Sequence, residues 1–97
     1  MAVYYKKDES MIGRQVANEF MLVPIRQNAA DLGYIYILDG VGGYIWGLLD
    51  DHATINDIVT SLTREYAVDA KQAEADVVEF LTQMKEIGAV SEKISED

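Results

Sequence analysis

Two kinds of apolar pattern divide the chain near its middle. Residues 12–38 are rich in Val, Ile, Tyr and Phe and break into short apolar runs, as strands do. Residues 41–90 repeat apolar side chains every three or four positions, which is the spacing of amphipathic helices. Because the strands come first and the helices follow, the pattern predicts an α+β domain rather than alternating strand–helix–strand units.

Three strands are predicted in the first half: residues 12–16 (IGRQV), 20–25 (FMLVPI) and 34–38 (YIYIL). The intervening residues 17–19 (ANE) suit a hairpin turn between the first two. Pro24 cannot donate to a ladder, so we expect an open side or a bulge there. Every residue of 34–38 is apolar or aromatic, which favours a strand that is covered on both faces or paired with something else.

The first two helices are predicted from their stripes and caps. Residues 41–49 carry one continuous apolar stripe that begins at Val41. Thr54 followed by Asp57 matches the start of a capping box, so we expect the second helix to begin there and to end at Tyr66.

The third helix is predicted to begin after Asp69, with Gln72 repeating the capping pattern, and to end at Gly88 in a left-handed conformation. Its core-facing residues are expected to be Ala73, Val77, Phe80, Leu81, Met84 and Ile87. The whole chain, residues 1–97, is interpreted as one domain with an ordered core at about residues 11–90 and a polar tail at each end.

Length and charge limit the possible functions. A chain of 97 residues holds one modest core. Its formal charge of −9 disfavours binding to nucleic acids, which depends on basic patches, and to anionic membranes. The sequence has no apolar run long enough to span a membrane, and no cysteine for a disulfide or thiolate chemistry. We expect a cytoplasmic protein that binds neither nucleic acid nor membrane.

The glycines Gly40, Gly42 and Gly43 follow a predicted strand and precede a helix, which is the layout of a phosphate-binding turn. The dinucleotide pattern G-x-G-x-x-G fails, because Ile45 occupies its third glycine position. A phosphate loop also fails, since no Gly-Lys-Ser/Thr follows and Asp39 adds negative charge. We interpret the glycines as a sharp chain reversal with φ > 0 that brings the helix close to the strand.

Few residues suggest catalysis or metal binding. His52 follows two aspartates, but adjacent residues rarely converge on one ion, so we interpret these residues as a solvated turn between helices. No serine has a plausible His and Asp setting. The pair Asp76 and Glu79 is expected on an exposed helix face. We therefore expect a non-enzymatic protein with no catalytic residue, metal or cofactor.

Two surfaces remain as candidates for binding. In a strand, Tyr34 and Tyr36 point to one face and Ile35 and Ile37 to the other. We expect the isoleucine face to pack on the helices, which leaves the tyrosines at the sheet's outer side, in solvent or against a partner. The second candidate is a row along the third helix that is either an ordinary flank or the wall of a groove beside the strand: Lys71, Ala75, Val78, Thr82 and Lys85.

One further pattern extends over residues 34–90. It consists of Leu38, Ile45, Trp46, Leu48 to Asp50, Thr54, Ile55, Leu62, Tyr66, Asp76, Val77, Phe80, Leu81 and Gly88. This pattern resembles the PqqD family, named for the pyrroloquinoline quinone biosynthesis chaperone, which shows a Leu-Asn at the end of a strand, an Ile-Trp in the next helix and a Leu-Leu-Asp-Gly turn. Here Asp39 replaces the Asn and Asp51 the Gly, so the specific pathway stays open.

The resemblance implies a winged-helix-like domain with a three-stranded antiparallel sheet and three helices. It implies binding of the leader segment of a ribosomally made precursor peptide, which is presented to a modifying enzyme, often a radical S-adenosylmethionine enzyme. The leader would add as a strand in the groove between the third strand and the third helix. Carried onto this chain, the peptide-binding residues are Tyr34, Ile35, Tyr36, Ile37, Leu38, Lys71, Ala75, Val78, Thr82 and Lys85.

Three alternatives remain open from the residues. A winged-helix transcriptional regulator has similar elements, although the acidic third helix here, with Glu74 and Glu86, suits a DNA groove poorly. A small catalytic or metal-binding domain would depend on His52. An open edge strand would also allow two copies of the chain to pair as a homodimer.

Overall fold

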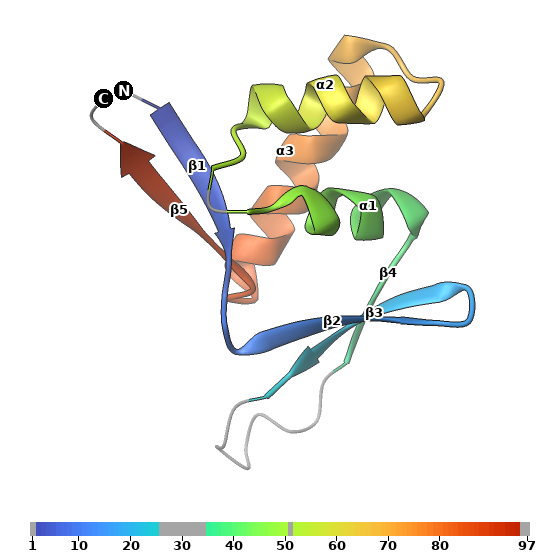
Figure 1. The fold of residues 1–97 in the computed structure, drawn as a ribbon, viewed down its shortest axis with the longest axis vertical. Coiled ribbons are helices and arrows are strands. Elements are labelled where there is room, and N and C mark those ends of the chain that lie inside the picture. Colours follow the sequence, from blue (N-terminus) through green and yellow to red (C-terminus); the bar gives the residue numbers. More distant parts are fainter. Residues whose placement is uncertain (1, 26–34, 51, 96–97) are drawn as a thin grey trace.

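The computed structural model describes residues 2–25, 35–50 and 52–95. The elements, in chain order, are β1 (Ala2–Lys7), β2 (Met11–Val16), β3 (Glu19–Pro24), β4 (Tyr36–Leu38), α1 (Gly40–Leu48), α2 (Ile55–Glu65), α3 (Ala70–Glu86) and β5 (Val90–Ser95) (Figure 1). The predicted α+β class is confirmed: a three-stranded antiparallel sheet is followed by three helices.

The sheet has the strand order β2–β3–β4. β2 and β3 form the predicted hairpin, in which Val16 pairs with Glu19 and Ala17 takes a left-handed φ of 54° at the turn. β4 pairs with β3 through three residues, from Phe20 opposite Leu38 to Leu22 opposite Tyr36. The third predicted strand is therefore present at residues 36–38, and it lies at an edge of the sheet.

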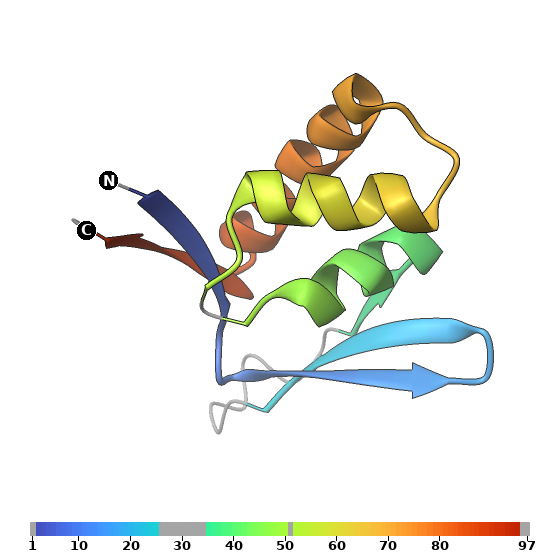
Figure 2. The same ribbon diagram turned by 45° about the horizontal axis from the view of Figure 1, so that its top comes forward.

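The two ends of the chain form an antiparallel ribbon, which the sequence did not indicate. β1 pairs with β5, and Val90 lies opposite Lys7 (Figures 1 and 2). Tyr5 and Val90 are buried, and the Tyr5 N–H donates to the carbonyl oxygen of Ala53 at 3.1 Å. Residues 2–7 and 91–95, which were expected in polar tails, therefore belong to paired strands, and the buried Tyr5 anchors the first of these segments to the core.

The predicted helix boundaries are confirmed by their caps. Thr54 and Asp57 form a reciprocal capping box at the start of α2. The carboxylate of Asp69 accepts a hydrogen bond from the Gln72 N–H at the start of α3. Gly88 follows α3 with a φ of 77°, the left-handed conformation expected at a helix C-terminus.

The glycines after β4 belong to the first turn of α1 rather than to a chain reversal. Among the described residues, Gly88 is the only glycine with a positive φ, so the expected φ > 0 at residues 40–43 is wrong. The expected close approach is present. A Cβ atom at Gly42 would lie 3.2 Å from the Phe80 ring, and one at Gly43 would lie 3.1 Å from Phe20. These glycines let α1 pack tightly against β3 and α3.

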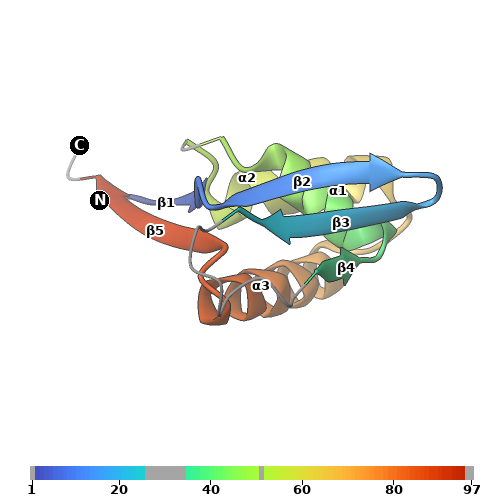
Figure 3. The same ribbon diagram turned by 90° about the horizontal axis from the view of Figure 1, so that it is seen from below.

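The three helices lie on one side of the three-stranded sheet (Figures 2 and 3). The core between them includes Leu22 at the centre of β3, Ile45 and Trp46 of α1, and the predicted stripe of α3 from Ala73 to Met84. Within the described residues, no helix has the length and hydrophobicity that a membrane span requires. Packing onto a single sheet face leaves the opposite face uncovered by helices.

Candidate functional site

The edge of β4 is the first component of the candidate site. β4 pairs with β3 on one side, and no strand in the described part of the chain pairs with its other side. Seen from below, β3, β4 and α3 follow one another in that order (Figure 3). An unpaired strand edge presents backbone N–H and C=O groups that can pair with another chain.

The side chains of β4 face in the opposite directions from those expected. Tyr36 and Leu38 pack against the core, whereas Ile35 and Ile37 are each 60% exposed. The expectation that the isoleucines pack on the helices is wrong. The register explains why, because Tyr36 lies opposite Leu22, which is completely buried, and paired residues point to the same face of a sheet. Tyr34 lies outside the described residues.

The predicted row on α3 lies on the exposed side of that helix. Lys71, Ala75, Val78, Thr82 and Lys85 are all exposed, and Val78 retains 43% of its accessible surface. The Lys85 ammonium pairs with the carboxylate of Glu92 on β5, and this hydrogen bond raises the pKa of Lys85. The C-terminal end of the row therefore turns toward β5.

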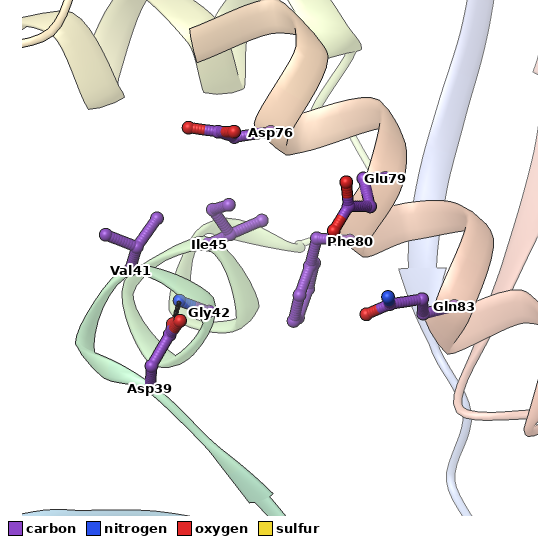
Figure 4. Close-up of a pocket in the computed structure, with 8 residues that line it drawn as sticks. All are labelled: Asp39, Val41, Gly42, Ile45, Asp76, Glu79, Phe80 and Gln83. Carbon is purple, nitrogen blue, oxygen red and sulfur yellow. Dashed lines mark hydrogen bonds between the residues drawn. The ribbon is translucent and has the colours of Figure 1, made fainter. Parts of the chain in front are cut away.

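A different flank of α3 faces the end of β4. Asp76, Glu79, Phe80 and Gln83 are spaced three and four residues apart, so they form one stripe along the helix. Together with Asp39, Val41, Gly42 and Ile45 they line a cavity of about 250 Å³ between the start of α1 and α3, which we call the α1–α3 cavity (Figure 4). Phe80 was expected in the core from the helical pattern, whereas the role of this flank in a cavity was not expected.

Asp39 connects this cavity to the strand edge. It follows Leu38 directly, and its Oδ1 atom accepts a hydrogen bond of 2.7 Å from the Gly42 N–H at the start of α1. A second cavity, of about 270 Å³, lies on the hairpin side, where Asp39 and Leu38 line it together with Phe20 and Tyr44. The end of β4 is thus bordered by two hollows that can accept side chains.

The structure places the residues that were considered for chemistry as follows. His52 is exposed, and its ring makes an edge contact with Tyr4 at 6.2 Å between centroids. The described residues contain no group of three His, Cys, Asp or Glu side chains placed to hold a metal ion. The candidate site therefore consists of an open strand edge beside a helix, with two adjoining cavities.

Comparison with known proteins identifies the family. The model of a family described as Coenzyme PQQ synthesis protein D (PqqD) matches residues 12–90. The chain belongs to the PqqD family. The match runs from β2 to the first residue of β5, so the PqqD family model includes the sheet, the three helices and the α1–α3 cavity. No match among curated proteins is significant.

Two solved structures share the PqqD-like fold. The structure of TbiB1 in complex with the TbiA(beta) leader peptide is 26% identical, with a TM-score of 0.74 over 89% of this chain and 94% of that chain. The structure of lasso peptide synthetase B1 complexed with the leader peptide is 24% identical, with a TM-score of 0.74 over 90% of this chain and 96% of that one.

The residues that resemble the PqqD family have mainly structural roles. Four of them are buried in the core, so their match to the family reflects core packing rather than contact with a ligand: Ile45, Trp46, Leu62 and Leu81. Asp39, in the family's usual Asn position, caps α1 through its carboxylate oxygen. Both side chains carry an oxygen that can accept this hydrogen bond, which explains why the departure leaves the helix start intact.

Proposed function

We propose that this protein is a non-catalytic adaptor that binds the leader of a ribosomally made precursor peptide and presents it to a modifying enzyme. The observation that carries the proposal is the open edge of β4 beside α3 in a chain of the PqqD family. The similarity to TbiB1, whose structure contains a leader peptide, supports the same conclusion.

In this proposal the leader adds to the sheet as a strand along residues 35–38. The main chain supplies ladder hydrogen bonds, while hollows beside the strand select alternate side chains. A micromolar complex requires about −8 kcal/mol. Because β4 is only three residues long, the ladder alone contributes little, and side chains anchored in the two cavities supply most of the affinity.

The chemistry then belongs to the enzyme that receives the precursor, and a radical S-adenosylmethionine enzyme fits the family resemblance. The protein would act in the cytoplasm, where such precursors are made. Pairing of two copies through β4 would occupy the same edge, so a homodimer and the peptide complex would compete. A DNA-binding role has no comparable support, since exposed Glu74, Glu79 and Glu86 make the surface of α3 acidic.

A titration followed by NMR tests the proposal. The ¹⁵N-labelled protein would be mixed with the leader of the precursor encoded beside its gene, and with a scrambled peptide as control. We expect the amides of residues 35–38 and of α3 to shift with the leader only. Unmoved signals at saturating leader would refute the binding site.

Two substitutions test which side of α3 contacts the bound leader. Ile37 and Val78 are both exposed, so Ile37→Asp and Val78→Asp should leave the fold intact. Ile37→Asp should weaken leader binding, because the added strand lies directly beside it. If the Lys71–Lys85 row forms the wall, Val78→Asp weakens binding to a similar degree; if the flank with Asp76 and Phe80 forms it, Val78→Asp has little effect.

A further inference from the structure

The α1–α3 cavity combines apolar side chains with an acidic rim. Its apolar lining residues are the half-buried Val41 and the buried Phe80 and Ile45. The carboxylates of Asp39, Asp76 and Glu79 surround it (Figure 4). Among the described residues that line the cavity there is no Lys, Arg or His. The cavity therefore has a defined chemical character rather than a uniformly polar or apolar one.

The three carboxylates are not neutralised within the described structure. Asp39 accepts a hydrogen bond from the Gly42 N–H, and Asp76 accepts one from the side-chain amide of Gln72 at 2.9 Å. Glu79 makes no hydrogen bond or ion pair with any described residue. Both donors are uncharged, and each carboxylate retains acceptor capacity for a further donor.

The basic residues on the same helix are placed elsewhere. Lys85 is paired with Glu92 on β5, and Lys71 lies in the exposed row outside the cavity. The chain has eight Lys and Arg residues against 17 Asp and Glu residues, so its own supply of cations is small. Since none of the described residues places a cation at the rim, the rim is open to a cation from a ligand.

We propose that the α1–α3 cavity accepts a lysine or arginine side chain of the bound leader, and this inference rests on the function proposed above. Lys and Arg have an apolar stem and a charged head, which match the interior formed by Phe80 and Ile45 and the carboxylates at the rim. A Leu side chain would fill the interior but leave the rim without a cation. A Glu side chain would be repelled. The cavity thus selects a basic residue next to the end of β4.

Selection from a random peptide library displayed on phage tests this inference, because it finds the preferred residues without a leader of defined sequence. The intact protein would be immobilised at about 50 mM salt, where charge pairs are weakly screened. We expect the selected peptides to carry Lys or Arg at one fixed position of an extended segment. Replacing that residue with Leu should weaken binding about fivefold to tenfold, and 0.5 M salt should reduce this difference.

A charge reversal with a matched control locates the effect. Glu79→Lys changes the rim of the cavity, whereas Glu74→Lys makes the same change at an exposed position of α3 outside the cavity. Both variants should fold, since both side chains are exposed. We expect Glu79→Lys to abolish the preference for Lys over Leu and Glu74→Lys to retain it.

The possible outcomes separate this inference from the proposed function. Selected peptides that shift the amides of residues 35–38 but bind equally well with Lys or Leu would refute the basic-residue site and leave the adaptor function standing. Equal effects of Glu79→Lys and Glu74→Lys would refute it too, because they would reflect net charge alone. Failure to select any peptide that shifts these amides would refute both proposals.

Discussion

Asp39 permits a direct test of how the end of β4 is held. Its Oδ1 atom accepts a 2.7 Å hydrogen bond from the Gly42 N–H, and the first turn of α1 contains no acidic residue that could take over this role. Replacing an N-cap Asp with Ala costs about 1 kcal/mol, within a range of roughly 0.5–2. For a domain of this size, such a loss lowers the melting temperature by about 4–8 °C.

The conservative variant separates the hydrogen bond from the charge. Asp39→Asn keeps an oxygen that can accept from Gly42, and because Asp39 is exposed we expect the free energy of unfolding to change by less than about 0.5 kcal/mol. Asp69→Ala is a matched control, because Asp69 caps α3 with the same 2.7 Å geometry. It should be destabilising by about the same amount as Asp39→Ala.

Urea unfolding followed by the fluorescence of Trp46 measures these differences. Trp46 is buried in α1 and is the only tryptophan, so its emission reports on the element that Asp39 caps. The midpoints should shift without a change in the m-value. Equal destabilisation by Asp39→Ala and Asp39→Asn would refute the hydrogen-bond argument, and an unchanged Asp39→Ala midpoint would show that the cap does not contribute to stability.

Three further predictions concern the core and use the same unfolding assay. Gly13→Ala would place a Cβ atom 2.6 Å from the indole nitrogen of Trp46 and should destabilise the protein by about 1–3 kcal/mol. In Gly47→Ala the added Cβ atom meets no atom within 4 Å, so this substitution should stabilise α1 by about 0.5–1 kcal/mol. Stability changes of the same sign for both variants would contradict this reasoning. Leu22→Ala removes a completely buried side chain and should destabilise the protein by about 2–5 kcal/mol. A loss below about 1 kcal/mol would mean that the surrounding side chains fill the cavity left by Leu22. Burial raises the pKa of Tyr5 above 10, so the unfolded state loses this proton first and stability should fall as the pH rises past about 10. Tyr5→Phe should make that fall shallower, and an unchanged pH profile would exclude Tyr5 as its source.

Local features were predictable because their causes lie within a few residues. The capping box of Thr54 and Asp57, the cap at Asp69 and the left-handed Gly88 all depend on neighbours within one helical turn. The apolar stripe of α3 needed only the helical period. The resemblance to the PqqD family was also visible in the sequence, because positions such as Trp46 are constrained by the core they fill.

The tertiary structure decided which faces and ends of these elements meet. Residues 35–38 are all apolar or aromatic, so the sequence pattern does not indicate which of their side chains are buried. The register of β4 against β3, in which Tyr36 lies opposite Leu22, determines which face packs on the core. The ribbon of β1 and β5 joins residues about 90 positions apart in the chain, beyond any local pattern.

The same distinction applies to the candidate site. The open strand and a neighbouring helix were expected from the sequence, but the α1–α3 cavity was not. The glycines at positions 42 and 43 let α1 approach Phe80 and Phe20, and Asp39 at the start of α1 lines the cavity together with Asp76 of α3. Residues so far apart in sequence meet through packing, and packing depends on the shapes of all the surrounding side chains rather than on any local period.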